Sequence, residues 1–330
     1  MSETENTPQE QVARFREDIA RVKAEVGKMI VGQDEIVDGV LTCLLAGGQA
    51  LLEGVPGLGK TMLVRTLAGV LRLDFSRIQF TPDLMPADII GTTVLTEGEG
   101  GKTRLEFRPG PVFANIVLAD EVNRATPKTQ SAMLEVMQEH SVTVSNRTHK
   151  LEEPYFVLAT QNPIEMEGTY PLPEAQLDRF LLRVDVPSPS AEGIVHILET
   201  SHAEQSELEL VLTADEVLEL QEVTASIPAS SDILELAART VVATHPTSET
   251  APDSVRRHVR YGASPRGAQA MLGAARARAL LAGRLHVSAE DLEAVVQPCL
   301  RHRLVLTYEG EAAGVSAGDL AEEAHERAQR

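Results

Sequence analysis

The spacing of apolar residues at the start of the chain predicts two amphipathic helices. Within residues 10–30 the apolar side chains recur every three or four positions, as one face of a helix requires. They are Val12, Phe15, Ile19, Val22 and Val26. Gly32 and Gln33 interrupt the pattern, and a second helix is expected through Leu45. The polar residues 1–9 are expected to be disordered.

Short apolar runs then alternate with helical patterns up to about residue 186. Five of these runs are expected to be strands, at 50–53, 76–80, 115–119, 154–159 and 181–186. This alternation predicts a parallel sheet with helices on both faces. Two segments interrupt the alternation and are expected to be β-hairpins: residues 92–108, and residues 141–151 with Asn146-Arg147 at the tip.

A Pro-Ser-Pro-Ser linker at 187–190 marks the start of a second unit, for which the pattern predicts helices only. They are expected at 190–205, 213–226, 229–243, 266–282 and 288–301. Ser264 and Ser288 have the character of helix N-caps. The expected organisation is a disordered segment 1–9, an α/β core 10–186 and a helical domain 187–330.

Composition narrows the function classes. The 330 residues are 43% hydrophobic and carry a net charge of −19, which argues against a nucleic-acid binder because such proteins need a basic surface. Cys43 and Cys299 lie in apolar helical patterns and are expected to be buried thiols, not a disulfide. No run of 18 apolar residues and no signal peptide is found, so a cytoplasmic protein without membrane insertion is expected.

Residues 54–61, Gly-Val-Pro-Gly-Leu-Gly-Lys-Thr, fit the phosphate-loop template between an apolar strand pattern and a helical one. Glycines let successive N–H groups point at one anion, Lys60 reaches the outer phosphates and the Thr61 hydroxyl can bind Mg²⁺. Nucleotide contacts are expected from Gly54, Val55, Pro56, Gly57, Leu58, Gly59, Lys60, Thr61 and Met62.

Two further strand ends carry candidate catalytic groups. Asp120 and Glu121 follow an apolar strand, which places them at the carboxyl edge of a parallel sheet beside the phosphate loop. Asp120 is expected to hold Mg²⁺, and Glu121 to polarise the attacking water. Asn162 follows the next strand and is expected to help place that water, although Asn-Pro is also a frequent turn.

Arginines offer a further hypothesis. Arg179 could reach the phosphates of a neighbouring subunit, or be a solvated charge at a domain edge. Arg266, at the start of a predicted helix, could contact phosphate or merely decorate the helix end. Arg124 and Lys128 could border a subunit contact or be helix-start charges.

Taken in order, these segments resemble the MoxR family of AAA+ ATPases. The resemblance rests on residues 54–61, 118–125, 159–163, 172–180 and 262–266, and covers roughly residues 25–305. It implies a P-loop NTPase αβα core with two β-hairpin insertions followed by an all-helical lid, and it assigns Gln33 to the adenine border, Arg179 to the arginine finger and Arg266 to the second sensor.

The resemblance also implies ATP hydrolysis with Mg²⁺, a homo-oligomeric ring that is usually a hexamer, and chaperone-like remodelling of protein complexes with a partner bearing a von Willebrand factor A domain. A nucleic-acid motor of the helicase-related clade is the alternative, and it requires basic hairpin tips. The first tip is acidic at Glu97 and Glu99, with Lys102 and Arg104 only on its return, whereas the second hairpin carries Arg147, His149 and Lys150. A nucleotide-gated scaffold with little hydrolysis is a third reading, against which Glu121, Asn162 and Arg179 argue.

Overall fold

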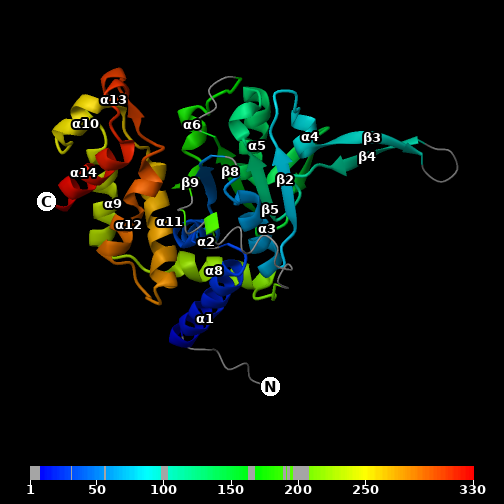
Figure 1. Ribbon diagram of the computed structural model, residues 1–330, viewed down its shortest axis with the longest axis horizontal. Coiled ribbons are helices and arrows are strands. Elements are labelled where there is room, and N and C mark those ends of the chain that lie inside the picture. Colours follow the sequence, from blue (N-terminus) through cyan, green and yellow to red (C-terminus); the bar gives the residue numbers. More distant parts are fainter. Residues whose placement is uncertain are drawn as a thin grey trace.

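The computed structural model describes residues 8–30, 32–55, 57–97, 103–162, 168–188, 191, 194–195 and 208–330. Within them the chain forms a parallel sheet flanked by helices, followed by a mainly helical part that packs beside the last strand (Figure 1). The expected disorder of residues 1–9 falls almost entirely outside the described residues, since the first helix begins at Pro8.

The central sheet has five parallel strands. They are β1 (Gln49–Glu53), β2 (Phe75–Gln79), β5 (Ile116–Asp120), β8 (Phe156–Gln161) and β9 (Phe180–Asp185). Their order is β2-β5-β8-β1-β9. β8 therefore lies between the strand before the phosphate loop and the strand before the acid pair. Because all carboxyl ends share one edge, the loops after β1, β5 and β8 converge there.

Alternate residues of these strands build two separate cores, one on each face of the sheet. Ala50, Leu118 and Leu158 belong to the first core, which the first three helices cover. Leu51, Val117 and Val157 belong to the second, which the next two cover. The helices are α1 (Pro8–Gly27), α2 (Asp34–Leu45), α3 (Lys60–Val70), α4 (Pro86–Ile90) and α5 (Pro127–Glu139). The period-two apolar pattern thus places helices on both faces, as the sequence predicts.

Both predicted hairpins are present. They are β3 (Gly91–Glu97) with β4 (Thr103–Pro109), and β6 (Ser141–Val144) with β7 (Arg147–Lys150). The first projects from the body of the molecule (Figure 1), and its turn lies outside the described residues. The second turns at Ser145 and Asn146, with φ of 51° and 62°. Positive φ at both residues suits a two-residue hairpin turn, so the tip lies one residue before the predicted Asn146-Arg147.

The part after β9 is mainly helical. It contains α8 (Ala214–Ser226), α9 (Ser231–Ala243), α10 (Asp253–His258), α11 (Pro265–Leu281), α12 (Ala289–Leu300), α13 (Tyr308–Ala312) and α14 (Ala317–Gln329). The expectation of helices only is wrong, because β10 (Val259–Tyr261) pairs antiparallel with β11 (Val305–Leu306). Strands of two or three residues are too short to show alternation. The helix predicted at 190–205 lies almost wholly outside the described residues.

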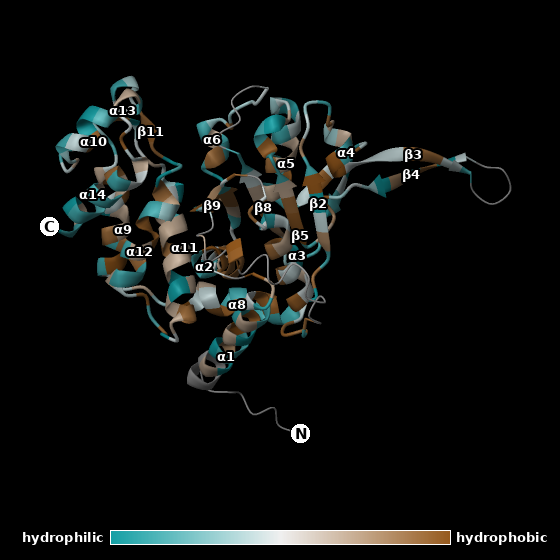
Figure 2. Ribbon diagram, in the orientation of Figure 1, coloured by the Kyte–Doolittle hydropathy of each residue, from teal (hydrophilic) through white to brown (hydrophobic). Residues whose placement is uncertain are grey.

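The first core continues into the helical part, which fixes it beside the sheet. Met271 of α11 and Leu292 of α12 belong to the same buried cluster as Leu182 of β9. Figure 2 shows hydrophobic residues along the central strands and hydrophilic ones over the outer surfaces of α10 and α14. Ser264 and Ser288 cap α11 and α12 as predicted. No helix in the described residues is long and apolar enough to cross a membrane.

Candidate nucleotide site

The loop after β1 is curled by glycines. Gly57 and Gly59 have φ of 85° and 77°, a left-handed conformation that glycine adopts without steric cost. A Cβ on Gly54 would lie 2.6 Å from the carbonyl oxygen of Val186, so the base of the loop packs closely on the end of β9. α3 begins at Lys60 and directs its first N–H groups toward the loop. Pro56 lies outside the described residues.

Lys60 lies inside this loop. Its Nζ donates to the Gly54 carbonyl oxygen at 2.5 Å. Partial burial lowers the pKa of the Lys60 ammonium, while the carboxylates of Asp120, Glu121 and Glu53 act in the opposite direction. A phosphate in the loop would add a further negative charge and stabilise the ammonium.

The acid pair at the end of β5 is held by Thr160 of β8. The Thr160 hydroxyl donates to Asp120 Oδ1 at 2.7 Å and accepts from the Glu121 N–H at 2.8 Å. Thr160 is buried, so these bonds are shielded from water. Arg77 of β2 lies on the other side of Asp120, with Nη2 2.6 Å from Oδ2. Asp120 is therefore fixed between two neighbouring strands.

Glu121 has the left-handed backbone conformation, with φ of 57°, before the short 3₁₀ helix η1 (Val122–Arg124). Such a conformation is uncommon for a residue with a Cβ and is enriched at functional sites. The Glu121 carboxylate accepts hydrogen bonds from Gln79 Nε2 at 2.9 Å and from Arg124 Nη1 at 2.8 Å. The side chain is thus held toward β2.

One cavity of about 210 Å³ brings the predicted groups together. Among the described residues it is lined by Gly54, Gly57, Leu58, Gly59, Lys60, Thr61, Arg77, Asp120, Glu121, Thr160, Gln161 and Asn162. Asn162 is buried, as expected of a side chain between the ends of β5 and β1. The phosphate loop, the acid pair and Asn162 thus converge on one space.

Three of the expected nucleotide contacts, Gln33, Val55 and Met62, are not among the residues that line this cavity. Gln33 Nε2 donates to the Leu58 carbonyl oxygen at 3.1 Å, so Gln33 supports the loop from outside. Met62 is 42% exposed on α3. Val55 lies in the loop and is half-buried.

The sequence pattern does not single out three polar residues of this site: Arg77, Gln79 and Thr160. Arg124 is expected from the sequence at a subunit contact or as a helix-start charge, whereas the structure places its guanidinium on the Glu121 carboxylate. Arg77 and Gln79 alternate with half-buried and apolar residues along β2, a pattern that any surface-facing strand shows. Arg77 and Gln79 lie at the end of β2, which pairs with β5 and so brings them beside the acid pair. The sequence does not reveal that pairing.

The donor set fits Mg²⁺. The Thr61 hydroxyl and the Asp120 carboxylate line the same cavity. Mg²⁺ typically takes one or two protein oxygens and completes its shell with phosphate oxygens and water. A cationic guanidinium already lies against Asp120, which shows that this carboxylate accommodates positive charge. No cluster of three or more His, Cys, Asp or Glu suited to a metal occurs in the described residues.

Arg179 and Arg266 do not line the cavity at the phosphate loop. They border a different cavity of about 320 Å³, together with Asp178 and Arg303. Arg266 Nη1 lies 3.8 Å from Asp178 Oδ2. The two predicted arginines are therefore close to each other, although they lie 87 positions apart in the sequence.

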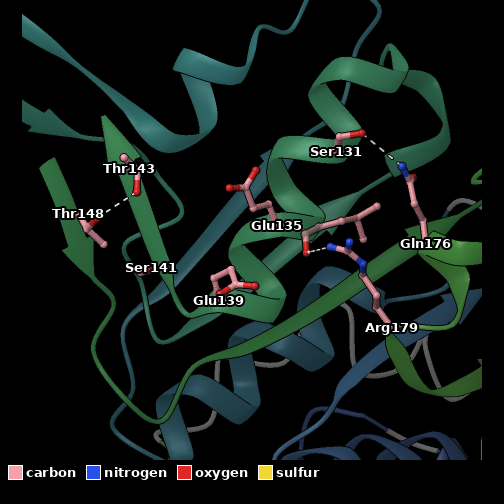
Figure 3. A pocket seen from close by; sticks show the side chains of 9 residues that line it. Ser131, Glu135, Glu139, Ser141, Thr143, Thr148, Gln176 and Arg179 are labelled. Carbon is pink, nitrogen blue, oxygen red and sulfur yellow. Dashed lines mark hydrogen bonds between the residues drawn. The ribbon is translucent and has the colours of Figure 1, made fainter. Parts of the chain in front are cut away.

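Arg179 also borders a polar cavity of about 600 Å³ between α5, the β6–β7 hairpin and α6 (Glu174–Leu177) (Figure 3). Its Nη1 donates to the Leu134 carbonyl oxygen at 2.6 Å. Glu135 and Glu139 of α5 line the same cavity. Arg179 thus lines this cavity together with residues of α5, the β6–β7 hairpin and α6.

Comparisons with known proteins identify relatives over most of the chain. A sequence model of the ATPase family associated with various cellular activities (AAA) matches residues 49–182, and a model of the AAA lid domain matches residues 253–324. The chain is 45% identical over 298 residues to Chaperone MoxR1 of Mycobacterium tuberculosis, covering 90% of this chain and 78% of that protein.

Two further comparisons agree with this. Protein MoxR of Methylorubrum extorquens is 32% identical over 309 residues, which cover 88% of this chain and 89% of that protein. A crystal structure of a candidate ATPase from Cytophaga hutchinsonii matches with a TM-score of 0.89 and 39% identity, covering 96% of each chain. By sequence and by fold, the chain belongs to the MoxR family of AAA+ ATPases.

Proposed function

We propose that this protein hydrolyses ATP to ADP and phosphate at sites shared between adjacent copies in a ring, and uses the cycle to remodel protein complexes. One observation carries the proposal. The phosphate loop and the acid pair converge on one cavity, whereas Arg179 and Arg266 converge on another. Because the nucleotide-binding residues and the arginines lie at separate cavities of one copy, the arginines of one copy would complete the nucleotide site of the next.

Within one copy, the residues of the loop hold the nucleotide. Backbone N–H groups of Gly57–Thr61 and the Lys60 ammonium bind the phosphates. Thr61 and Asp120 would hold Mg²⁺, which neutralises charge on the phosphate oxygens when bound. Gln33 contacts the loop, Val55 is part of it and Met62 follows it on α3, and these three would border the rest of the nucleotide. Pro56 completes the loop in sequence.

Glu121 and Asn162 act on the attacking water. Glu121 polarises it as a general base, and the Asn162 amide orients it from the next strand. In the free protein the Glu121 carboxylate is bound by Gln79 and Arg124. Catalysis then requires that the carboxylate leave these partners or share them with the water.

Arg179 and Arg266 of one copy stabilise the charge that develops on the phosphates held by the next. A guanidinium suits this role because it is always charged and presents several donors in a rigid plane. Such a head-to-tail contact repeats until it closes, which gives a ring, and we expect six copies. The 600 Å³ cavity beside Arg179 would then lie at the contact.

The remodelling role is favoured over nucleic-acid translocation. The described part of the β3–β4 hairpin balances Arg104 and Arg108 with Glu97 and Glu106, so it presents no basic stripe. The net charge of −19 opposes binding to a polyanion, and the relative from Mycobacterium tuberculosis is called a chaperone. We further propose that the protein acts on a protein client in the cytoplasm, together with a partner that bears a von Willebrand factor A domain.

The test compares nucleotide binding with turnover in three variants. Lys60→Ala should lose fluorescent ATP-analogue binding and phosphate release together. Glu121→Gln should bind the nucleotide as the wild type does and release no phosphate, because only the base is lost. Glu219→Gln, on the exposed face of α8, is the matched control for removing a carboxylate. Full turnover by Glu121→Gln would overturn the role of Glu121.

A further inference from the structure

The carboxylate of Asp178, directly before Arg179, meets three residues of the helical part. Asp178 Oδ1 lies 2.9 Å from Arg303 Nε. Asp178 Oδ2 accepts from the Ser264 hydroxyl at 2.9 Å and lies 3.8 Å from Arg266 Nη1. One side chain next to the predicted arginine finger therefore contacts the start of α11 and the segment after α12.

Arg303 fixes the backbone on both sides of Arg179. Its Nη2 donates to the carbonyl oxygens of Asp178 at 3.1 Å and Phe180 at 2.7 Å. Its Nη1 donates to the Leu181 carbonyl oxygen at 3.3 Å and also to that of Cys299. The Arg303 side chain is only 3% exposed. A buried guanidinium whose three nitrogens are all engaged has little freedom to move.

The opposite side of Arg179 is held by the core. Its Nη1 bonds the Leu134 carbonyl oxygen of α5, and Gln176 Nε2 lies 3.3 Å from the Ser131 hydroxyl. Arg179 thus lies between α5 and the helical part. The position of its guanidinium relative to Arg266 depends on how the helical part sits against residues 178–181.

We propose that Asp178, together with Arg303, is a positioning residue that sets Arg179 and Arg266 in one fixed relation, so that both reach a neighbouring copy's nucleotide at once. The Asp178 carboxylate faces Arg266, and Arg179 follows Asp178 in the chain, so the position of one residue bears on both arginines. A displacement of about 1 Å at a catalytic group can cost on the order of a hundredfold in rate, so a rigid link has a catalytic consequence. This inference rests on the proposed function, in which the arginines act on the next subunit.

The test uses Asp178→Asn in the full-length protein. The variant should bind the ATP analogue at its own phosphate loop within about twofold of the wild type, keep KM within about threefold and lose about tenfold or more in kcat. Asp185→Asn is the matched control, because Asp185 also joins β9 to the helical part, through Arg301, but lies away from Arg179. Its kcat should stay near that of the wild type.

Mixing experiments separate positioning from a defect in the variant's own site. Asp178→Asn mixed with Glu121→Gln should recover turnover, because the second variant supplies sound arginines and the first a sound base. Asp178→Asn mixed with Arg179→Ala should recover none. Arg303→Lys keeps the charge without the planar guanidinium. Like Asp178→Asn, it should keep nucleotide binding and KM near the wild-type values, and it should lose less kcat than Asp178→Asn does.

Several outcomes would overturn the inference. The first is a wild-type kcat in Asp178→Asn, and the second is an equal loss of kcat in Asp185→Asn. The third is that Asp178→Asn fails to assemble, as measured by light scattering, while Arg303→Lys retains full kcat. The fourth is that Asp178→Asn does not recover turnover when mixed with Glu121→Gln although Arg179→Ala does. If Arg179→Ala also fails to recover with Glu121→Gln, the shared site itself is wrong, and the inference falls with it.

Discussion

The Asp120 carboxylate lies against the Arg77 guanidinium of the neighbouring strand, with Oδ2 2.6 Å from Nη2 and 3.1 Å from Nε. Arg77 therefore supplies positive charge where the site would hold Mg²⁺. The Arg77 side chain is 47% exposed, and exposed pairs are worth about 0.2–1 kcal/mol.

We predict that Arg77→Ala lowers the Mg²⁺ concentration for half-maximal ATPase activity by about two- to fivefold, because a competing cation is removed. Titration of Mg²⁺ at saturating ATP measures it, with Arg239→Ala on the exposed face of α9 as control. An unchanged or higher Mg²⁺ requirement would show that Arg77 acts on the nucleotide instead.

Gln79 provides a second test. It donates to Glu121 at 2.9 Å and holds the carboxylate toward β2. A hydrogen bond to a charged group contributes about 1.5–3 kcal/mol. Gln79→Ala removes one of the two side chains that hold Glu121, while Arg124 keeps its contact, so basal kcat should rise by up to about fivefold. Single-turnover phosphate release measures the change. A large drop in kcat would mean that Gln79 positions Glu121 for the reaction.

The sequence and the structure agree on the central elements because buried strands and amphipathic helices have clear apolar periods. The expected strand at 50–53 is β1 at Gln49–Glu53, and the expected helix at 266–282 is α11 at Pro265–Leu281. Glycines and a serine cap mark these boundaries in the sequence itself. The two hairpins were predictable for the same local reasons.

The order of the strands and the positions of the arginines could not be predicted from the sequence as well as the central elements could. Gln79 pairs in register with Asp120 across two strands 41 positions apart, a relation that no local pattern contains. The proximity of Arg179 and Arg266 likewise depends on how α11 docks beside β9. The β10–β11 pair was missed because its strands are two and three residues long.

His302 gives the folded state a pH dependence. The residue is 5% exposed; burial, and then the positive charge of Arg303, hold the pKa of His302 well below 6.5. Below about pH 6.5 the His302 imidazole binds a proton in the unfolded chain but stays neutral in the native state. Unfolding therefore takes up a proton, and the free energy of unfolding falls as pH decreases.

We therefore expect His302→Gln to reduce the fall in unfolding free energy between pH 6.5 and 5 by at most about 1.4 kcal/mol per pH unit. Urea unfolding at a series of pH values measures this slope. His286→Gln, at an exposed position, is the control for the substitution. Equal slopes in wild type and His302→Gln would contradict a neutral native His302.

The two cysteines should be unreactive in the folded protein. Cys43 and Cys299 are both fully buried free thiols. Burial raises the pKa of Cys299 to about 12 and that of Cys43 well above its usual value. Since the thiolate is the reactive form, a thiol reagent at pH 8 should modify neither until denaturant is added. Rapid modification of the native protein would show that this core opens readily.

The central claim is that each ATPase site takes its base from one copy and its arginine from the next. The most direct measurement is ATPase activity in mixtures of Arg179→Ala and Glu121→Gln at varied ratios. Each variant alone should be nearly inactive, because an arginine finger contributes about 10³–10⁵ in kcat. At equal amounts, about a quarter of the sites join an intact base to an intact arginine, so activity should reach about a quarter of the wild-type value. No activity at any ratio, or wild-type activity in Arg179→Ala alone, would contradict the account.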